Sequence, residues 1–297
     1  MSIAKLHDVA APAKLNLFLH VVGRRADGYH LLQSLFVLID WCDTLHFERR
    51  SDGRLTRHDL GPTLPADDLC LRAARLLQVE SGSTLGADIS IDKQVPWGAG
   101  MGGGSSDAAS TLLALNHLWG LRWPFSRLLP LALALGADVP FFLGGRNAFV
   151  EGIGERLTPL LVGPMQFAVV KPATGIETRA LFASPLLARD TEPVTLAGSS
   201  ANVDSLLSGF GRNDLQNAAQ AACPEVAEAA ALLNAAYGNG RMTGSGSAVF
   251  ARVDERIHSD GSVGRSGAAL LAGLPAGWQG KMCRSLHEHP LVGWARE

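Results

Sequence analysis

The fold class that the sequence predicts is α+β, in two globular domains, and three observations support it. The chain has 297 residues, of which 47% are hydrophobic and 18% charged, so it can bury a substantial core. Segments that alternate with period two, as strands do, lie between segments with a helical spacing of apolar residues. The texture of the chain changes near residues 158–164. We therefore place one domain over residues 1–160 and a second over residues 161–297.

Charge and composition exclude several classes of protein. The net charge of −2 argues against a general nucleic-acid or acidic-membrane binder, because such proteins rely on a basic surface. No stretch approaches the roughly 18 uninterrupted apolar residues of a membrane span, and we find no apolar signal segment. We expect a soluble cytoplasmic protein with free thiols at its four dispersed cysteines, Cys42, Cys70, Cys223 and Cys283.

Alternating side chains predict a half-buried first strand over residues 14–22. Lys14 and Asn16 project from one side of it and form a hydrogen-bonding pair, although a solvated strand face is an alternative. The polar turn that follows ends in Tyr29 and His30. A plain loop explains the turn, but an aromatic face beside a titratable ring is also typical of a ligand contact. Further strands are expected over residues 31–39 and 44–48.

Two of the helices expected in the first domain lie one before and one after the middle of its sequence. The first, over residues 67–78, has Asp67 or Asp68 as its cap. The second, over residues 126–135, stops at Gly136, and Pro140 is expected to prevent its resumption. Asp138 is the only acid in this strongly apolar run, so it must be paired, hydrogen-bonded or used in chemistry. A capping or structural aspartate is the alternative.

A glycine-rich loop at residues 96–109 lies between a strand over 88–92 and a helix over 108–119. Its five glycines in seven residues would cost ordering entropy for no gain in a mere connection. The helix N-terminus, capped by Ser105 or Ser106, favours negative charge, so we expect a phosphate or polyphosphate here. The candidate phosphate-binding residues are Pro96, Gly98, Ala99, Gly100, Met101, Gly102, Gly103, Gly104, Ser105 and Ser106.

Two other phosphate motifs fit this loop less well. Residues 98–103 match the dinucleotide-binding fingerprint formally. That motif requires an acidic residue about 20 positions further on to bind the ribose, but no acidic residue occurs between Asp107 and Asp138. The loop also lacks the lysine of the P-loop enzymes. It must therefore take a cation from elsewhere in the chain.

The second domain is expected to start with a strand over residues 166–170. A surface segment over 196–210 and alanine-rich helices over 213–222 and 225–237 follow. A second small-residue loop, Arg241 to Ser247, precedes a strand over 248–253. By itself this loop is a weak signal, and a hairpin turn explains it equally well.

Taken together, these motifs resemble those of the GHMP small-molecule kinases over residues 10–253. The resemblance implies an N-terminal domain like domain 2 of ribosomal protein S5, a ferredoxin-like C-terminal domain and an active site in the cleft between them. It rests on residues 14–17, 23–24, 27–30, 96–109, 135–140 and 242–246.

The resemblance also implies roles for single residues. Asp138 would be the general base and Lys14 would orient it beside the transferring phosphoryl group, with ATP on residues 98–106 and Ser105 or Ser106 near Mg²⁺. Lys-Leu-Asn-Leu, Asp-Gly-Tyr-His and Gly-Ala-Asp-Val-Pro point to a member whose acceptor is a cytidine-linked alcohol. The acceptor and its phosphates would be held by Asn16, Tyr29, His30, Thr178, Phe182, Gly244, Ser245 and Gly246, with Tyr29, His30 and Phe182 around the cytosine.

Other functions remain open on the sequence. A kinase for homoserine or mevalonate would give no reason for Tyr29, His30 and Phe182. A nucleotide-binding regulator with a dead site would be expected to have lost Lys14 or Asp138. A Rossmann-type oxidoreductase would bind reduced nicotinamide. No motif marks the adenine pocket, and a solvated strand end is the favoured interpretation of the neighbouring residues 93 and 94.

Overall fold

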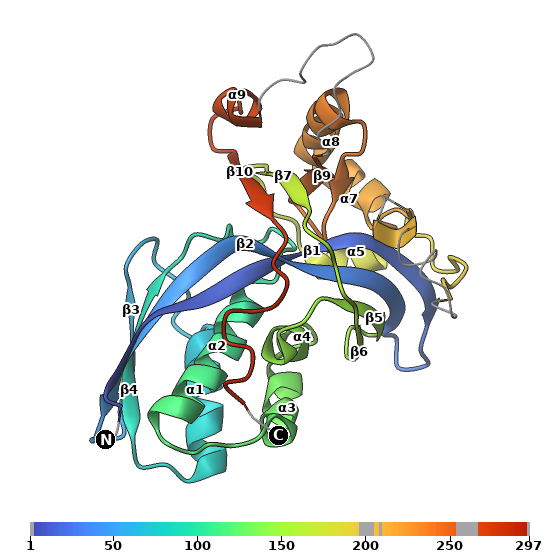
Figure 1. Cartoon of the computed structure of the whole chain (residues 1–297). Helices are drawn as coiled ribbons and strands as arrows, with labels where there is room; N and C mark the ends of the chain where they lie inside the picture. Colours follow the sequence, from blue (N-terminus) through green and yellow to red (C-terminus); the bar gives the residue numbers. More distant parts are fainter. Residues whose placement is uncertain (1–2, 196–204, 208–209, 254–266, 296–297) are drawn as a thin grey trace.

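The computed structural model describes residues 3–195, 205–207, 210–253 and 267–295, so most of the expected surface segment at 196–210 lies outside the described part (Figure 1). The strands are β1 (Lys5–Arg24), β2 (His30–Arg50), β3 (Leu55–Asp59), β4 (Gly86–Asp92), β5 (Ala148–Gly152), β6 (Arg156–Pro159), β7 (Gln166–Lys171), β8 (Arg241–Met242), β9 (Val249–Arg252) and β10 (Gln279–Arg284). The helices are α1 (Leu69–Ser81), α2 (Gly103–Leu118), α3 (Phe125–Leu135), α4 (Val139–Gly144), α5 (Thr178–Ala183), α7 (Gln216–Ala222), α8 (Pro224–Tyr237) and α9 (Gly267–Ala272).

Two sheets form the frame. The first has the order β3-β4-β2-β5-β6, with β1 pairing antiparallel to β2, and the second has the order β10-β7-β9-β8. The first sheet ends at Pro159 and the second begins at Gln166, so the change of texture in the sequence coincides with the passage between sheets. After β10 the chain returns to the first unit, where the amide of Leu286 donates to the carbonyl of Leu38 at 2.8 Å.

The two sheets and the helices are arranged in layers (Figure 1). Helices α1 to α4 pack against one face of the first sheet, and the second sheet covers part of its other face. Within β7, Phe167 and Val169 point into the core between the sheets, whereas Ala168 and Val170 join the core beneath α7 and α8. Successive side chains of β7 thus point to opposite faces of the strand and pack into two different cores.

The structure corrects two expectations about the first strands. Residues 14–21 of β1 are buried on both faces rather than half-buried. The apolar side packs against the second sheet, and the side expected in solvent is covered by Asp138 of the first unit and Thr243 of the second. The strands expected over 31–39 and 44–48 are one continuous strand, β2. The acids between them find partners, since Asp43 Oδ1 accepts from two backbone amides at 2.7 Å and Asp40 Oδ1 accepts from the Arg284 amide at 2.8 Å.

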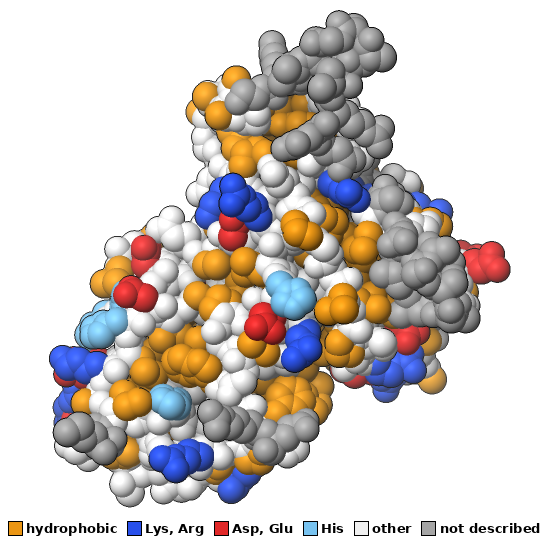
Figure 2. Space-filling view, viewed as in Figure 1, with side chains coloured by type: hydrophobic (Ala, Val, Ile, Leu, Met, Phe, Trp, Pro, Cys, Tyr) orange, Lys and Arg blue, Asp and Glu red, His pale blue; other side chains and the backbone are white. Residues whose placement is uncertain are grey.

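The surface carries no sign of a specialised charged face in the view of Figure 2, where basic side chains lie scattered among acidic and apolar ones. Within the described ranges, no helix is long and apolar enough to cross a membrane.

Candidate active site

The glycine-rich loop is held against the small-residue loop of the second unit. The amide of Ser247 donates to the Gly98 carbonyl at 3.0 Å, and the amide of Ala248 donates to the Ala99 carbonyl at 3.2 Å. Gly100 has a φ of +72°, and a Cβ there would lie 2.4 Å from the carbonyl oxygen of Thr243. Only glycine permits this close approach of two backbones. The glycine-rich loop and the second loop, which by itself is a weak signal, therefore form one structure, which also includes the hairpin turn between β8 and β9.

Helix α2 begins earlier than expected and without a serine cap. Its N-cap is Gly102, with φ +72° and no side-chain capping bond, so Ser105 and Ser106 lie inside the first turn. The glycines themselves adopt the helical turn, and the expectation of a serine cap is wrong. The amide of Ser106 donates to the Gly102 carbonyl at 2.9 Å, whereas the amides of residues 103–105 have no acceptor in the helix and so favour negative charge. They border a cavity of about 440 Å³, which we call the donor cavity and which Ser105 but not Ser106 lines.

Lys14 is the cation that the glycine loop lacks. Its side chain is buried, and its ammonium donates to the Gly100 carbonyl at 3.1 Å and to Asn16 Oδ1. Lys14 Nζ also lies 3.6 Å from Asp138 Oδ2 and 4.6 Å from the centre of the Phe36 ring. Lys14 and Asn16 therefore share one side of the strand, as expected, and the solvated-face alternative is wrong.

Asp138 stands at the start of α4, opposite Lys14. Gly136 ends α3 as expected, but Pro140 occupies the first turn of α4 and so begins a new helix instead of preventing one. Proline suits this position because its missing N–H would have no helical partner. The Asp138 carboxylate makes no capping bond, and its side chain is 30% exposed. It is therefore available to a ligand.

Burial lowers the pKa of Lys14 from its ordinary value of 10.5, and Asp138 only partly restores it. If the ammonium form supports catalysis, kcat should fall with rising pH at a midpoint below 10.5. A pH series of kcat tests this. Lys14→Arg, whose guanidinium stays charged, should show lower but pH-independent activity over the same range. A wild-type kcat that stays flat up to 10.5 would contradict the expectation.

A second cavity of about 170 Å³, which we call the acceptor cavity, adjoins the donor cavity. Thr178 Oγ1 and Ser245 Oγ lie 2.7 Å apart where the two cavities meet. Both cavities are lined by Gly100, Gly102, Thr178 and Ser245. The acceptor cavity also brings together, from the residues expected in the site, Lys14, Asn16, Asp138, Phe182 and Gly244, whereas Gly246 lines the donor cavity.

The aromatic residues expected around a cytosine are only partly assembled. The His30 and Phe182 rings stack directly on each other, with centroids 5.0 Å apart. Arg189 fastens this pair, because its Nε donates to His30 Nε2 at 3.3 Å and its Nη2 to the Phe182 carbonyl at 3.0 Å. Tyr29 is 60% exposed and does not line the acceptor cavity. The described geometry thus joins His30 and Phe182 and leaves Tyr29 apart.

Sequence reasoning missed a group of charges beneath the loop. Lys93 is largely buried and bonds to both Asp43 and Asp107, so the favoured view of it as a solvated strand end is wrong. Asp107 belongs to the glycine motif, but nothing in the sequence links it to Asp43. Asn213 was also missed: its Nδ2 donates to the carbonyls of Met242 and Gly244, both at 2.8 Å, and so holds the second loop.

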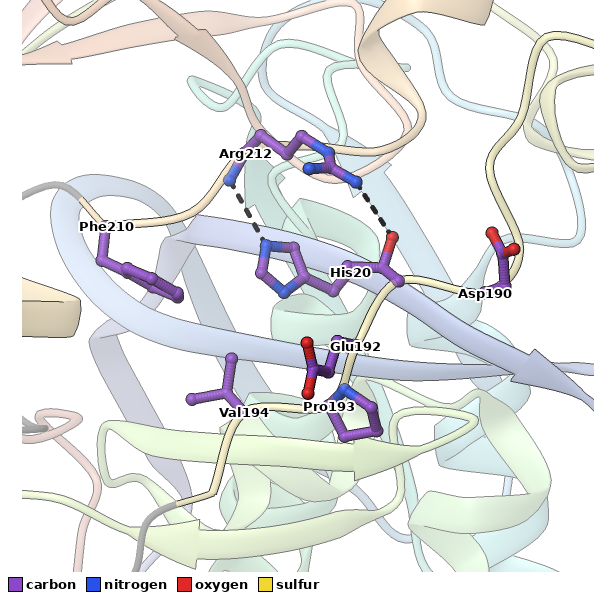
Figure 3. A pocket seen from close by; sticks show the side chains of 8 residues that line it. His20, Asp190, Glu192, Pro193, Val194, Phe210 and Arg212 are labelled. Carbon is purple, nitrogen blue, oxygen red and sulfur yellow. Dashed lines mark hydrogen bonds between the residues drawn. The ribbon is translucent and has the colours of Figure 1, made fainter.

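Another cavity, of about 500 Å³, lies beside the site and shares none of its residues with the two cavities above. The amide of Arg212 donates to His20 Nε2 at 3.4 Å, and its Nη2 donates to Thr191 Oγ1 at 3.2 Å (Figure 3). The carboxylate of Asp214 accepts from the amide of Val21 at 2.8 Å. These bonds fasten the end of β1 to the second unit.

The residues of the site fit a divalent metal that arrives with a polyphosphate. Within the described ranges, no three His, Cys, Asp or Glu side chains gather into a metal-binding group. Mg²⁺ commonly binds through substrate phosphates, waters and one or two protein oxygens, so no protein cage is needed. Ser105 at the donor cavity and the partly exposed Asp138 offer such oxygens, while Ser106 Oγ is buried without a hydrogen-bond partner among the described atoms.

Residues 68–146 match the GHMP kinases N terminal domain, and residues 192–260 match the GHMP kinases C terminal domain. The chain is 63% identical to the 4-diphosphocytidyl-2-C-methyl-D-erythritol kinase of Methylibium petroleiphilum, over 99% of this chain and 100% of that protein. It is 56% identical to the enzyme of the same name from Albidiferax ferrireducens, over 98% and 96% of the two chains.

The chain also resembles solved structures of kinases. The crystal structure of a 4-(cytidine 5'-diphospho)-2C-methyl-D-erythritol kinase superposes with a TM-score of 0.76 at 35% identity, covering 95% of this chain and 98% of that one. A homoserine kinase from Cytophaga hutchinsonii superposes with a TM-score of 0.65 at 17% identity, covering 96% and 95%. The latter likeness extends to the fold alone.

Proposed function

We propose, since this chain belongs to the GHMP kinase family, that it transfers the terminal phosphoryl group of ATP to the 2-hydroxyl of 4-diphosphocytidyl-2-C-methyl-D-erythritol, a step in the non-mevalonate route to isoprenoid precursors. One observation carries the proposal: the donor and acceptor cavities meet at Gly100 and Gly102, beside the Lys14–Asp138 pair. Phosphoryl transfer requires mainly such positioning and charge neutralisation.

Each residue of this pair has a distinct task. The Asp138 carboxylate accepts the proton of the acceptor hydroxyl, whose oxygen bonds to the terminal phosphorus while the bond to the bridging oxygen breaks and ADP leaves. Lys14, held by the Gly100 carbonyl and Asn16, offsets the negative charge between the cavities. Mg²⁺, when bound to the ATP phosphates near Ser105, supplies further charge neutralisation.

Specificity for the cytidine part is assigned to Phe182, which lines the acceptor cavity, to His30 stacked on it and to the adjoining Tyr29. Since His30 and Phe182 already stack on each other, a cytosine between them would force the rings apart. The base instead stacks on the part of Phe182 that lines the acceptor cavity, and the exposed Tyr29 closes over it. Thr178 and the loop Gly244-Ser245-Gly246 border the phosphates.

The deciding experiment measures ATP-dependent phosphorylation of the cytidine-linked acceptor in the presence of Mg²⁺ and compares it with 2-C-methyl-D-erythritol, homoserine and mevalonate. We expect efficient transfer only to the cytidine-linked alcohol. Faster transfer to homoserine or mevalonate would establish a different kinase of the same family. Nucleotide binding without transfer to any alcohol would favour the regulator, and reduced-nicotinamide binding would favour an oxidoreductase.

The state of His30 should govern binding of the acceptor. Burial, together with Arg189 and Arg24, lowers the pKa of His30 from 6.5, so the ring stays neutral near pH 7 and accepts from Arg189. Protonation would remove that acceptor and set two cations together. The KM for the cytidine-linked acceptor should therefore rise only below 6.5, while the KM for ATP changes little. An acceptor KM that stays constant through the acid range, or an ATP KM that rises in parallel, would refute this role.

A further inference from the structure

The direction of a nucleotide in the donor cavity follows from its junction with the acceptor cavity. The phosphoryl group to be transferred must lie at the shared residues, among them Gly100 and Ser245. In a nucleoside triphosphate the base is the group farthest from the terminal phosphate. The base therefore belongs in the part of the donor cavity that does not adjoin the acceptor cavity. The apolar residues that line the donor cavity but not the acceptor cavity include Leu64, Pro65, Leu69 and Trp97.

Trp97 is unusual among the tryptophans of this protein. It is 71% exposed, whereas Trp41, Trp119 and Trp123 are exposed by 6%, 7% and 8%. An indole in water presents a large flat apolar surface, which a planar ligand can cover. Trp97 directly precedes Gly98, whose φ of +64° turns the chain into the phosphate-binding loop. The exposed indole is thus attached to the segment that would hold the phosphates.

Among the described residues, four charged ones line the donor cavity, and each is already paired: Asp67 with Arg75, Asp68 with Arg57, and Asp107 with Lys93. Lys93 lines the donor cavity, but its ammonium already bonds to Asp43 and Asp107. Because these charges are paired with one another or with neighbouring side chains, contact area and stacking decide how the base is held. An aromatic face accepts any base, because every base has a π-face.

We propose that Trp97 is the base-stacking residue of the donor cavity and that its indole covers the purine of the nucleotide. This inference rests on the proposed function, because it takes a nucleoside triphosphate as the donor. It assigns to Trp97 affinity for the base without discrimination between adenine and guanine. The phosphates remain the task of the glycine loop and Lys14.

Two probes separate the base from the phosphates: ADP, which carries both, and tripolyphosphate, which has no base. Calorimetry measures their binding, and acrylamide quenching of tryptophan fluorescence measures the exposure of the indole. We expect ADP but not tripolyphosphate to protect the wild type from quenching. Trp97→Ala should weaken ADP binding about 5- to 100-fold, equivalent to the loss of one stack, without affecting tripolyphosphate.

Matched variants complete the test. Trp97→Phe should retain ADP affinity, since a flat ring remains, but lose the protection signal. Trp278→Phe, which alters a tryptophan packed in the second unit, should retain both. Unchanged quenching of the wild type at saturating ADP, or an equal loss of ADP and tripolyphosphate affinity in Trp97→Ala, would overturn the inference. ADP binding and protection without phosphoryl transfer would refute only the proposed function, and a wild type that binds no ADP would refute both.

Discussion

Replacing Asp138 by asparagine should lower kcat by about 10²- to 10⁴-fold, the range expected for loss of a general base. Asparagine keeps the shape of the side chain but does not accept the proton of the acceptor hydroxyl. It also removes the negative partner 3.6 Å from the ammonium of Lys14. Single-turnover rates at saturating ATP and acceptor measure the effect. Binding of ADP in the absence of Mg²⁺ should change little, because Asp138 does not line the donor cavity.

The control for this variant is Asp190→Asn, which neutralises an exposed acid at a separate cavity. Its kcat should equal that of the wild type. The melting temperature of the Asp138 variant should fall, because the buried Lys14 ammonium loses its carboxylate partner, so kcat is compared well below both melting temperatures. A kcat for Asp138→Asn within a few-fold of the control would show that transfer needs no base at this position.

Gly100→Ala should damage both stability and catalysis. Its Cβ would lie 2.4 Å from the Thr243 carbonyl oxygen and 2.7 Å from the Gly246 amide nitrogen, at a φ of +72° that side chains rarely adopt. The two loops must therefore separate, at a cost of about 1–3 kcal/mol by the scale of overpacked sites. Displacement of the phosphate-binding backbone should lower kcat/KM by about 10²-fold. Thermal unfolding and steady-state kinetics test the two effects.

Two other glycines separate backbone strain from the clash. Gly98→Ala introduces a side chain at φ +64° with its nearest neighbour 3.9 Å away, so it carries the strain alone. A Cβ at position 175 would meet nothing within 4 Å, and Gly175 does not have a positive φ, so Gly175→Ala introduces neither the clash nor the strain. We expect activity to decrease from Gly175→Ala to Gly98→Ala to Gly100→Ala. Equal activity of the last two would show that contact between the loops is unimportant.

Much of the candidate site could be proposed from the sequence because its signals are local. A glycine run between a strand and a helix indicates bare backbone for an anion, whatever surrounds it. The alternation of a strand places Lys14 and Asn16 on one side, and a lone acid in an apolar run marks Asp138. The resemblance to the GHMP kinases combined these local signals into the prediction of a kinase with an α+β fold, and this fold class is confirmed.

Only the tertiary structure decided how distant segments meet. It paired Lys14 with the Gly100 carbonyl and Asp138, set Lys93 between Asp43 and Asp107, and stacked His30 on Phe182 while leaving Tyr29 apart. It also placed the serines of the glycine loop inside α2 and merged two expected strands into β2. The physical reason is that periodicity and turn chemistry depend on neighbours along the chain, whereas burial and the partners of a polar group depend on which other segment covers it.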